Sequence, residues 1–340
     1  MQDSYGRNID YVRISVTDKC NLRCRYCMPN GVVWVPMSEI LSIEEIVFTV
    51  RAMSKIGINK IKITGGEPLV RKGCLNLIKM LKGIPGIDEV TLTTNGVLLE
   101  ENLPSLIDAG IRAVNISLDT LDREKYKMIT GYDHLNKVLS SVEASINSGI
   151  FVKLNAVSVN WALVEGNKTN YEDESRVLNE AIKLVEFARS RNICVRFIEM
   201  MPIGLGKEYP GIPHSILIPG IMKRYEGMEP DNKKYGNGPA VYYSIPGFMG
   251  KIGFISAIND KFCDSCDRVR LTVDGNFKTC LCYDKGVGLK NVLRSDKSDV
   301  DKEKNLMELM RQAIIEKPES HCFEDKSMIS EKRTMSSIGG

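Results

Sequence analysis

Alternating apolar and polar positions mark six short segments in the first 200 residues, and a pattern of helical period follows each one. Side chains alternate across a strand, so this alternation predicts strands, whereas apolar residues three and four apart predict helices. Six strand–helix units in series predict a parallel sheet with right-handed crossovers. The predicted strands are Tyr11–Val16, Ile58–Ile63, Glu89–Thr94, Ile111–Ser117, Ile150–Val157 and Ile193–Ile198.

Local signals support this division into strands and helices. Ser42 and Glu45 have the spacing of a capping box at the start of a helix, and Gly57 follows that helix. Strand–helix alternation ends near residue 200, so we predict a domain over residues 1–200 and a separate C-terminal region over residues 201–340. The other predicted elements are a helix over 172–191, turn-rich stretches at 202–220 and 227–239, strands near 241–258 and 268–273, and a helix near 303–316.

The predicted strands carry polar residues at every second position, which places these residues on one face. A flat sheet covered by helices would bury these charges at a cost of several kcal/mol each. A curved sheet instead turns the same face into a polar lumen; the alternative is that some of these residues lie at strand ends and reach solvent. The residues are Arg13 and Ser15, Lys62 and Thr64, Thr91 and Thr93, Asn115 and Ser117, Lys153 and Asn155, and Arg196.

A polar lumen favours an α/β fold of the TIM-barrel type. A closed barrel of this type needs eight strand–helix units, and the sequence shows six. An incomplete barrel leaves strand edges and an open side that must be covered. We therefore predict an incomplete (βα)6 TIM-type barrel with a C-terminal α+β appendage covering the barrel opening.

Charge and composition restrict the partners. The net charge is only +3, so the sequence favours a local anion site over a nucleic-acid-binding surface. No apolar run of about 18 residues is present, so we expect no membrane partner. The first residues resemble neither a signal peptide nor a transit peptide, so we expect a cytoplasmic protein, or a mitochondrial matrix protein if the chain is a processed eukaryotic form.

The cysteines carry the candidate chemistry, because ten are present against only three histidines. Cys20, Cys24 and Cys27 form a C-x3-C-x2-C run directly after the first strand. Three thiolates on one short loop can hold three corners of a cubane iron–sulfur cluster and leave one iron open to a small molecule. A structural zinc site would need a fourth, distant ligand. The remaining alternative is three unrelated thiols.

The motifs of this chain resemble those of the radical S-adenosylmethionine (SAM) enzymes and, among these, of the GTP 3′,8-cyclases of molybdenum cofactor biosynthesis. The resemblance covers nearly the whole chain, and each motif in the predicted barrel lies at or just after the carboxyl end of a strand, where barrel enzymes keep their chemistry. The matching segments are RISVTDKC at 13–20, CRYCMP at 24–29, ITGGEPL at 63–69, TTNG at 93–96, NISLD at 115–119, VRFIE at 195–199, CDSCDRVR at 263–270 and IGG at 338–340.

The resemblance implies two [4Fe–4S] clusters, held by Cys20, Cys24 and Cys27 and by Cys263, Cys266 and Cys280. It implies SAM contacts at Tyr26, Gly66, Ser117 and Met201. Glu67 offers an acceptor for an ammonium group; an ordinary Gly-Pro turn is the alternative for residues 65–68. The resemblance also implies that the Gly339-Gly340 tail reaches the active site. The GTP contacts that it implies are Arg13, Lys62, Thr93, Lys153, Arg196, Arg268, Val269 and Arg270.

The implied reaction is a radical cyclisation that removes hydrogen from C3′ of GTP and joins C3′ to C8, giving 3′,8-cyclo-7,8-dihydro-GTP. The implied partners are an electron donor of flavodoxin or ferredoxin type, cyclic pyranopterin monophosphate synthase as the next enzyme, and a second copy of the chain in a homodimer. The rival hypotheses are a two-cluster peptide maturase and a zinc-bound RNA-binding module.

Two departures from the family pattern remain. Cys282 gives a C-x2-C…C-x-C pattern that by itself resembles a zinc ribbon. We expect the other cysteines, Cys74, Cys194 and Cys322, to be packing residues without partners. The loop over residues 158–173 is longer than in the family, so the alignment there is uncertain.

Overall fold

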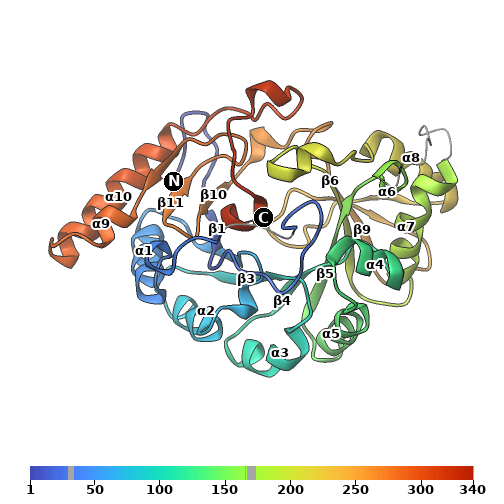
Figure 1. Ribbon diagram of the computed structural model, residues 1–340, viewed down its shortest axis with the longest axis horizontal. Coiled ribbons are helices and arrows are strands. Elements are labelled where there is room, and N and C mark those ends of the chain that lie inside the picture. The colour runs from blue at the N-terminus through green and yellow to red at the C-terminus, as the bar shows by residue number, and fades with distance from the viewer. Residues whose placement is uncertain (30–33, 165, 167–173, 340) are drawn as a thin grey trace.

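The computed structural model describes residues 1–29, 34–164, 166 and 174–339. Six strands pair in parallel in the order of the chain and form a curved sheet (Figure 1). This arrangement confirms the predicted series of strand–helix units. The strands are β1 (Tyr11–Ser15), β2 (Lys60–Thr64), β3 (Glu89–Thr94), β4 (Ala113–Ser117), β5 (Phe151–Ser158) and β6 (Cys194–Glu199).

Helices cover the outside of the curved sheet (Figure 1). Their apolar faces pack on the outward-facing strand residues, such as Val12, Ile14 and Ile63, which are fully buried. The predicted capping box is confirmed, because Ser42 Oγ accepts a hydrogen bond from the Glu45 amide and the Glu45 carboxylate accepts one from the Ser42 amide. The helices are α1 (Ile43–Lys55), α2 (Cys74–Lys82), α3 (Leu99–Asp108), α4 (Arg123–Thr130), α5 (Leu135–Asn147), α6 (Trp161–Val164) and α7 (Glu174–Phe187).

The C-terminal region extends the sheet at both edges, which the sequence did not predict. β9 (Lys251–Ile255) pairs in parallel with β6, and β10 (Arg268–Leu271) pairs in parallel with β1. Neither strand belongs to a strand–helix unit, so periodicity alone could not assign them to the barrel. The domain boundary at residue 200 stays a prediction. Antiparallel strands continue the sheet beyond both edges. Next to β9 lie β8 (Val241–Ser244) and then β7 (Glu229–Asp231). Next to β10 lie β11 (Asn276–Lys278) and then β12 (Gly286–Gly288).

The turn-rich prediction for residues 202–220 is wrong in its last third. Helix α8 (His214–Arg224) covers the end of this stretch and contains Pro219 and Gly220. A Cβ atom at Gly220 would collide with the side chain of Leu178 on α7, so the glycine permits close packing of the two helices. Tertiary packing therefore outweighs the low helix propensity of this segment.

The last part of the chain crosses back over the barrel. After α9 (Lys290–Leu293) and α10 (Asp299–Ile315), residues 318–339, which we name the C-terminal segment, lead to the short helix α11 (Met335–Ile338). In Figure 1 this helix lies in the middle of the ring beside β1, and Ser15 Oγ donates to the carbonyl of Ser336 at 3.4 Å. In the described part of the chain, no helix is long and apolar enough to cross a membrane.

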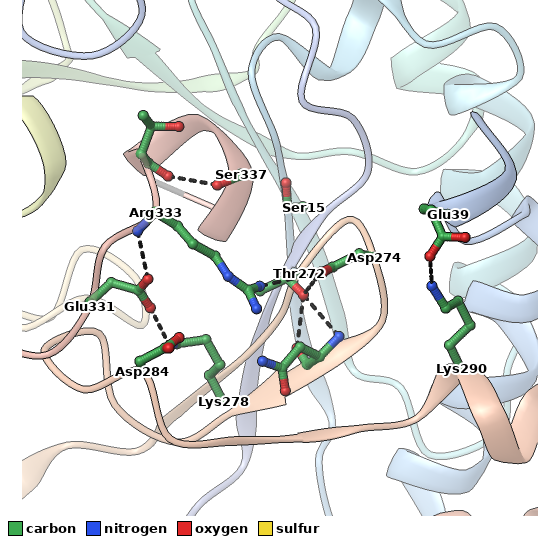
Figure 2. Close-up of polar contacts among 12 residues, drawn as sticks. Ser15, Glu39, Thr272, Asp274, Lys278, Asp284, Lys290, Glu331, Arg333 and Ser337 are labelled. Carbon is green, nitrogen blue, oxygen red and sulfur yellow. Dashed lines mark hydrogen bonds and ion pairs between the residues drawn. The ribbon is translucent and has the colours of Figure 1, made fainter. Parts of the chain in front are cut away.

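Two ionic contacts hold the C-terminal segment on the β10–β11 hairpin (Figure 2). Lys278 on β11 forms an ion pair with Glu331, and both side chains are 0% exposed. Arg333 lies 3.4 Å from the carboxylate of Asp274 in the hairpin turn. Because the segment ends beside β1, these contacts determine where the tail meets the barrel interior.

Candidate active site

A cavity lies inside the curve of the sheet, and its walls come from both parts of the chain. Barrel strands and the C-terminal strand β10 contribute basic side chains to it. The same wall contains Met201, which we predicted to contact SAM, and the thiols of the second cysteine set. Six of the eight residues predicted to bind GTP line this cavity: Arg13, Lys62, Lys153, Arg196, Arg268 and Arg270.

The register of the sheet explains this clustering. Arg13 on β1 is paired with Lys62 on β2 and with Arg270 on β10, so three cations form one row across neighbouring strands. Lys153 on β5 lies in the next part of the same face, and Arg196 on β6 pairs in register with Asn155. The Asn155 side-chain oxygen accepts hydrogen bonds from Arg196 Nε at 2.9 Å and Nη2 at 2.6 Å. The polar face thus becomes a cationic lumen, as predicted.

The cationic side chains are crowded and largely withdrawn from water. Burial, followed by the charges of Arg196, Lys153 and Arg13, holds the pKa of Lys62 well below its ordinary value. Burial and the charge of Arg196 lower the pKa of Lys153 to about 8. Like charges confined in a poorly solvated space repel each other, so a polyanionic ligand would stabilise all of them.

Thr93 and Val269, the other two residues predicted to bind GTP, do not line the cavity. Thr93 Oγ1 accepts a hydrogen bond from Asn115 Nδ2 at 3.4 Å, which orients a neighbouring polar residue of the wall. Val269 is fully buried, because strand alternation points it away from the face that carries Arg268 and Arg270. A role for either residue in GTP binding stays a prediction.

The first cysteine loop follows β1 and is attached to the end of α4. The amide of Arg23 donates to the carbonyl of Thr130, and the amide of Arg25 donates to that of Ile129. Within the loop, the amides of Cys27 and Met28 both donate to the carbonyl of Cys24. These backbone bonds fold the C-x3-C-x2-C run back on itself.

The three thiols of this loop lie close enough to influence one another. Burial raises the pKa of Cys24 well above its ordinary value, and the neighbouring Cys27 and Cys20 raise it further. Two N–H groups point at the Cys20 sulfur, the Leu22 amide at 3.4 Å and Asn95 Nδ2 at 3.6 Å. Thiolates that share a site need a positive centre between them, and N–H donors to sulfur are typical of iron–sulfur sites. The donor set therefore fits a [4Fe–4S] cluster.

Three of the residues predicted to contact SAM, Tyr26, Gly66 and Ser117, lie in or beside this loop. Tyr26 donates a hydrogen bond from its hydroxyl group to Asp119 Oδ2 at 2.7 Å. Ser117 lines a small cavity together with Cys24, Tyr26 and Asp119. Gly66 packs on the loop itself, because a Cβ atom there would overlap the Lys19 carbonyl. The SAM contacts of Tyr26, Gly66, Ser117 and Met201 stay predictions.

The Glu67 carboxylate already has hydrogen-bond partners within the fold. Its carboxylate accepts hydrogen bonds from the Leu69 amide at 3.0 Å, Thr94 Oγ1 at 2.8 Å and the Asn95 amide at 2.7 Å, and its side chain is buried. Burial raises its pKa to about 7. The carboxylate thereby connects the turn after β2 to the end of β3, and its predicted role as an ammonium acceptor stays a prediction.

The second cysteine set forms part of the cavity wall. Cys263 and Cys266 lie on a short 3-10 turn, and Cys280 follows β11; all three line the same cavity as the cations. Burial works to raise the pKa of Cys266, but the charges of Lys317 and Arg268 lower it. Three thiols with adjacent cations fit a second cluster that faces the anion site.

Cys282, the fourth cysteine of the zinc-ribbon alternative, does not line the cavity with this set, although Cys280 packs against its apolar cluster. Its side chain is fully buried in a small apolar cluster with Ile203, Phe323 and Ile338 and is not part of the cavity wall. Its sulfur lies 3.2 Å from that of Cys322. The expectation that Cys322 has no partner is therefore wrong; the C-terminal segment brings it back from 40 residues away.

The tail also reaches the cavity wall. Arg270 donates hydrogen bonds to the carbonyls of Ile338 and Gly339. Gly339 adopts a φ of +77° and packs so closely on Thr64 that a Cβ atom would lie 2.8 Å from the Thr64 hydroxyl oxygen. The position therefore requires glycine. Gly340 lies outside the described residues.

Two buried cations of the site were missed by the sequence analysis. Arg7 donates to the carbonyls of Cys263, Pro318 and Glu319, which joins the second cysteine turn to the C-terminal segment. Lys317 donates to the carbonyls of Arg268 and Thr279 and lines the cavity. Both residues lie outside periodic segments, so no pattern marked them.

Comparisons with known proteins agree with this geometry. A family model described as Radical SAM superfamily matches residues 14–171, and one described as Molybdenum Cofactor Synthesis C matches residues 193–323. A GTP 3′,8-cyclase of Clostridium perfringens (strain SM101 / Type A) is 42% identical over 341 residues, and one of Alkaliphilus oremlandii (strain OhILAs) is 39% identical over 342 residues. Each comparison covers 100% of this chain and 100% of the relative.

Among solved structures, Streptococcus suis SuiB bound to S-adenosylmethionine has a similar fold. The TM-score is 0.59 with 14% identity, and the match covers 96% of this chain and 76% of that chain. At this identity the likeness concerns the fold alone, and together with the parallel sheet it confirms the predicted partial barrel.

Proposed function

The chain belongs to the GTP 3′,8-cyclase family of radical SAM enzymes, and we propose that it converts GTP to 3′,8-cyclo-7,8-dihydro-GTP, the first step of molybdenum cofactor biosynthesis. The observation that carries this proposal is the cavity lined by eight arginine and lysine side chains, with cysteine thiols in its wall. The direct test is anaerobic reconstitution with iron and sulfide, followed by SAM, dithionite and GTP. Formation of 5′-deoxyadenosine that depends on GTP supports the cyclase, and absence of iron binding contradicts it.

The first cysteine loop would hold a [4Fe–4S] cluster through Cys20, Cys24 and Cys27. When bound, that cluster and SAM supply the radical chemistry that removes hydrogen from C3′ of GTP. The protein's own contribution at this end is positional: backbone bonds to α4 fix the loop, and Asn95 donates to the Cys20 sulfur. Tyr26, Gly66, Ser117 and Met201 would bind and orient SAM, with Glu67 holding the adjacent turn in place.

The cationic lumen would bind the triphosphate. Guanidinium and ammonium groups form charge-assisted hydrogen bonds with phosphate oxygens, and these bonds are strong where water is scarce. Arg13, Lys62 and Arg270 would act from one row of the sheet, and Lys153 and Arg196 from the next strands. The C-terminal segment beside β1 would limit the entry of water to the reacting atoms.

Lys153→Ala is expected to weaken GTP binding to the loaded enzyme by about 30-fold or more, since losing one partner of a buried charge pair costs roughly 2–5 kcal/mol. Anaerobic calorimetry with GTP measures this loss. Lys55→Ala is the matched control, because that lysine is exposed on α1 and pairs with Glu303. An affinity unchanged by Lys153→Ala would refute the assignment of the lumen to GTP.

The same lysine predicts a pH dependence of binding. The pKa of Lys153 is lowered to about 8 by burial and by Arg196, so the empty site loses this positive charge as the pH rises through 8. A bound triphosphate stabilises the ammonium form, so titration of Lys153 makes the affinity fall above pH 8 by up to about tenfold per pH unit. Calorimetry at pH 7, 8 and 9 measures this fall. Lys153→Arg should remove this contribution and leave that of Lys62, whose pKa is also lowered, and the same slope in that variant would contradict the assignment.

A second [4Fe–4S] cluster on Cys263, Cys266 and Cys280 is part of this proposal, supported by the thiols in the cavity wall. The reconstituted protein is then expected to contain about eight iron atoms, and Cys266→Ala about four. The control is Cys194→Ala, which replaces a buried cysteine on β6 and should keep about eight iron atoms. Stoichiometric zinc in place of this iron would instead favour the zinc-ribbon alternative.

We further propose an electron donor of flavodoxin or ferredoxin type, cyclic pyranopterin monophosphate synthase as the next enzyme, a homodimer and a cytoplasmic location. Exposed Lys19 and Arg25 beside the first cysteine set offer positive charge to an acidic donor. Reduction of the reconstituted protein by a purified ferredoxin tests the proposed electron donor. The mass of the reconstituted protein in solution tests the proposed homodimer.

A further inference from the structure

Two of the four thiols outside the proposed clusters lie side by side. Cys282 follows Cys280 by two residues, and Cys322 lies in the C-terminal segment. Their sulfur atoms are 3.2 Å apart, and the Cys322 amide also points at the Cys282 sulfur at 3.5 Å. A disulfide requires a sulfur–sulfur distance of about 2.05 Å, so a movement of roughly 1 Å would join them.

The surroundings keep the two sulfurs together. Both side chains belong to an apolar cluster with Phe323, Ile329 and Ile338, so water does not separate them. The Glu331 amide donates to the Cys282 carbonyl at 3.2 Å, and the Tyr283 hydroxyl group donates to the Ser320 carbonyl at 3.2 Å. The chain around Cys282 is thus attached to the C-terminal segment on both sides of Cys322.

We propose that Cys282 and Cys322 form a reversible dithiol–disulfide site whose substrates are low-molecular-weight organic disulfides. Neither thiol belongs to a predicted cluster set, although Cys280 of the second set packs against their apolar cluster. When closed, it ties the segment that ends at Gly339 covalently to the chain beside Cys280.

The exposure of the two thiols sets the order of the exchange. Both residues are buried, Cys322 at 8% exposure and Cys282 at 0%, so in our proposal the reagent meets Cys322 first. Cys322 gives its proton to water, and its thiolate attacks one sulfur of the organic disulfide, forms a mixed disulfide and releases one thiolate. That thiolate takes the proton of Cys282, whose sulfur then displaces the second organic group from Cys322 as a thiolate, and this thiolate takes a proton from water. Two electrons pass from the protein dithiol to the organic disulfide, which leaves as two thiols.

The consequence is a restraint on the tail. Closing a loop of 40 residues removes many of the open conformations of the C-terminal segment. Local opening that exposes the backbone amides of residues 326–338 becomes rarer, and their hydrogen exchange is expected to slow by about tenfold or more.

The test uses the anaerobic, cluster-loaded protein treated with oxidised glutathione, trapped with N-ethylmaleimide and mapped without reduction. The expected product is a peptide pair linked through Cys282 and Cys322, with slower exchange over residues 326–338. The Cys282→Ser and Cys322→Ser variants should each lack the link. The Cys194→Ser variant, which replaces a buried cysteine on β6, should retain it.

Other outcomes would overturn the proposal. These are glutathione that stays on Cys322, a link that joins other cysteines, and a Cys282 thiol that stays unlinked and reacts with the maleimide only after unfolding. Mapping of the wild-type protein alone decides the question if a variant fails to fold. The link requires neither SAM cleavage nor GTP binding, so failure of the proposed cyclase activity would leave this result interpretable.

Discussion

Replacement of Cys24 by alanine is expected to abolish GTP-dependent formation of 5′-deoxyadenosine. Cys24 is the middle thiol of the C-x3-C-x2-C run, and its carbonyl also accepts the two backbone bonds that fold the loop. Loss of an outer partner of a metal site costs about 10–100-fold, so loss of a ligand should cost more than about 10³-fold. Activity is measured by chromatography of the quenched anaerobic reaction.

The iron content separates this effect from unfolding. Cys24→Ala should keep about four iron atoms, those on the second cysteine set, and should keep its affinity for GTP. Cys74→Ala is the matched control, because Cys74 is also a buried cysteine but lies at the start of α2 in the apolar core. Full activity in Cys24→Ala, or equal loss in Cys74→Ala, would argue against the assignment of the first cluster to this loop.

The sequence could predict the lumen because strand alternation is a local property. Arg13 and Lys62 were assigned to one face from their spacing alone, and the parallel register of β1 and β2 places them side by side. Arg270 shows the limit of this reasoning. Its alternation with Arg268 was evident, but its pairing with Arg13 depends on a contact between residues more than 250 positions apart. No periodic pattern encodes that contact.

The same limit explains the errors in the C-terminal region. Cys322 was assigned no partner because its neighbour in space, Cys282, is 40 residues away and connected through irregular chain. Residues 202–220 were predicted to be turn-rich, yet Pro219 and Gly220, which have strong intrinsic preferences against helix, lie inside α8. In the fold, Gly220 is instead a contact point of α8 with α7, since a Cβ atom there would lie 2.3 Å from the Leu178 side chain.

Replacement of Glu331 by glutamine is expected to destabilise the protein by about 3–5 kcal/mol, because it leaves the Lys278 ammonium buried without its counter-charge. Lys278 also donates to the Tyr283 carbonyl at 2.7 Å, which cannot offset a full charge, and Asp284 is 3.9 Å away and half exposed. Urea unfolding of the anaerobic protein measures the change. Glu316→Gln is the matched control, because its pair with Lys285 is exposed and its loss should change little.

The position of this ion pair adds a second expectation, that the tail loosens before the barrel does. Glu331 also accepts a hydrogen bond from the Arg333 amide at 2.8 Å, so the substitution disturbs the segment directly before α11 (Figure 2). Hydrogen exchange over residues 333–338 should therefore accelerate in Glu331→Gln, while β1 to β6 stay protected. The double variant Lys278→Met, Glu331→Leu removes both charges and should recover most of the stability. If it remained as unstable as Glu331→Gln, packing rather than an unpaired buried charge would be the cause.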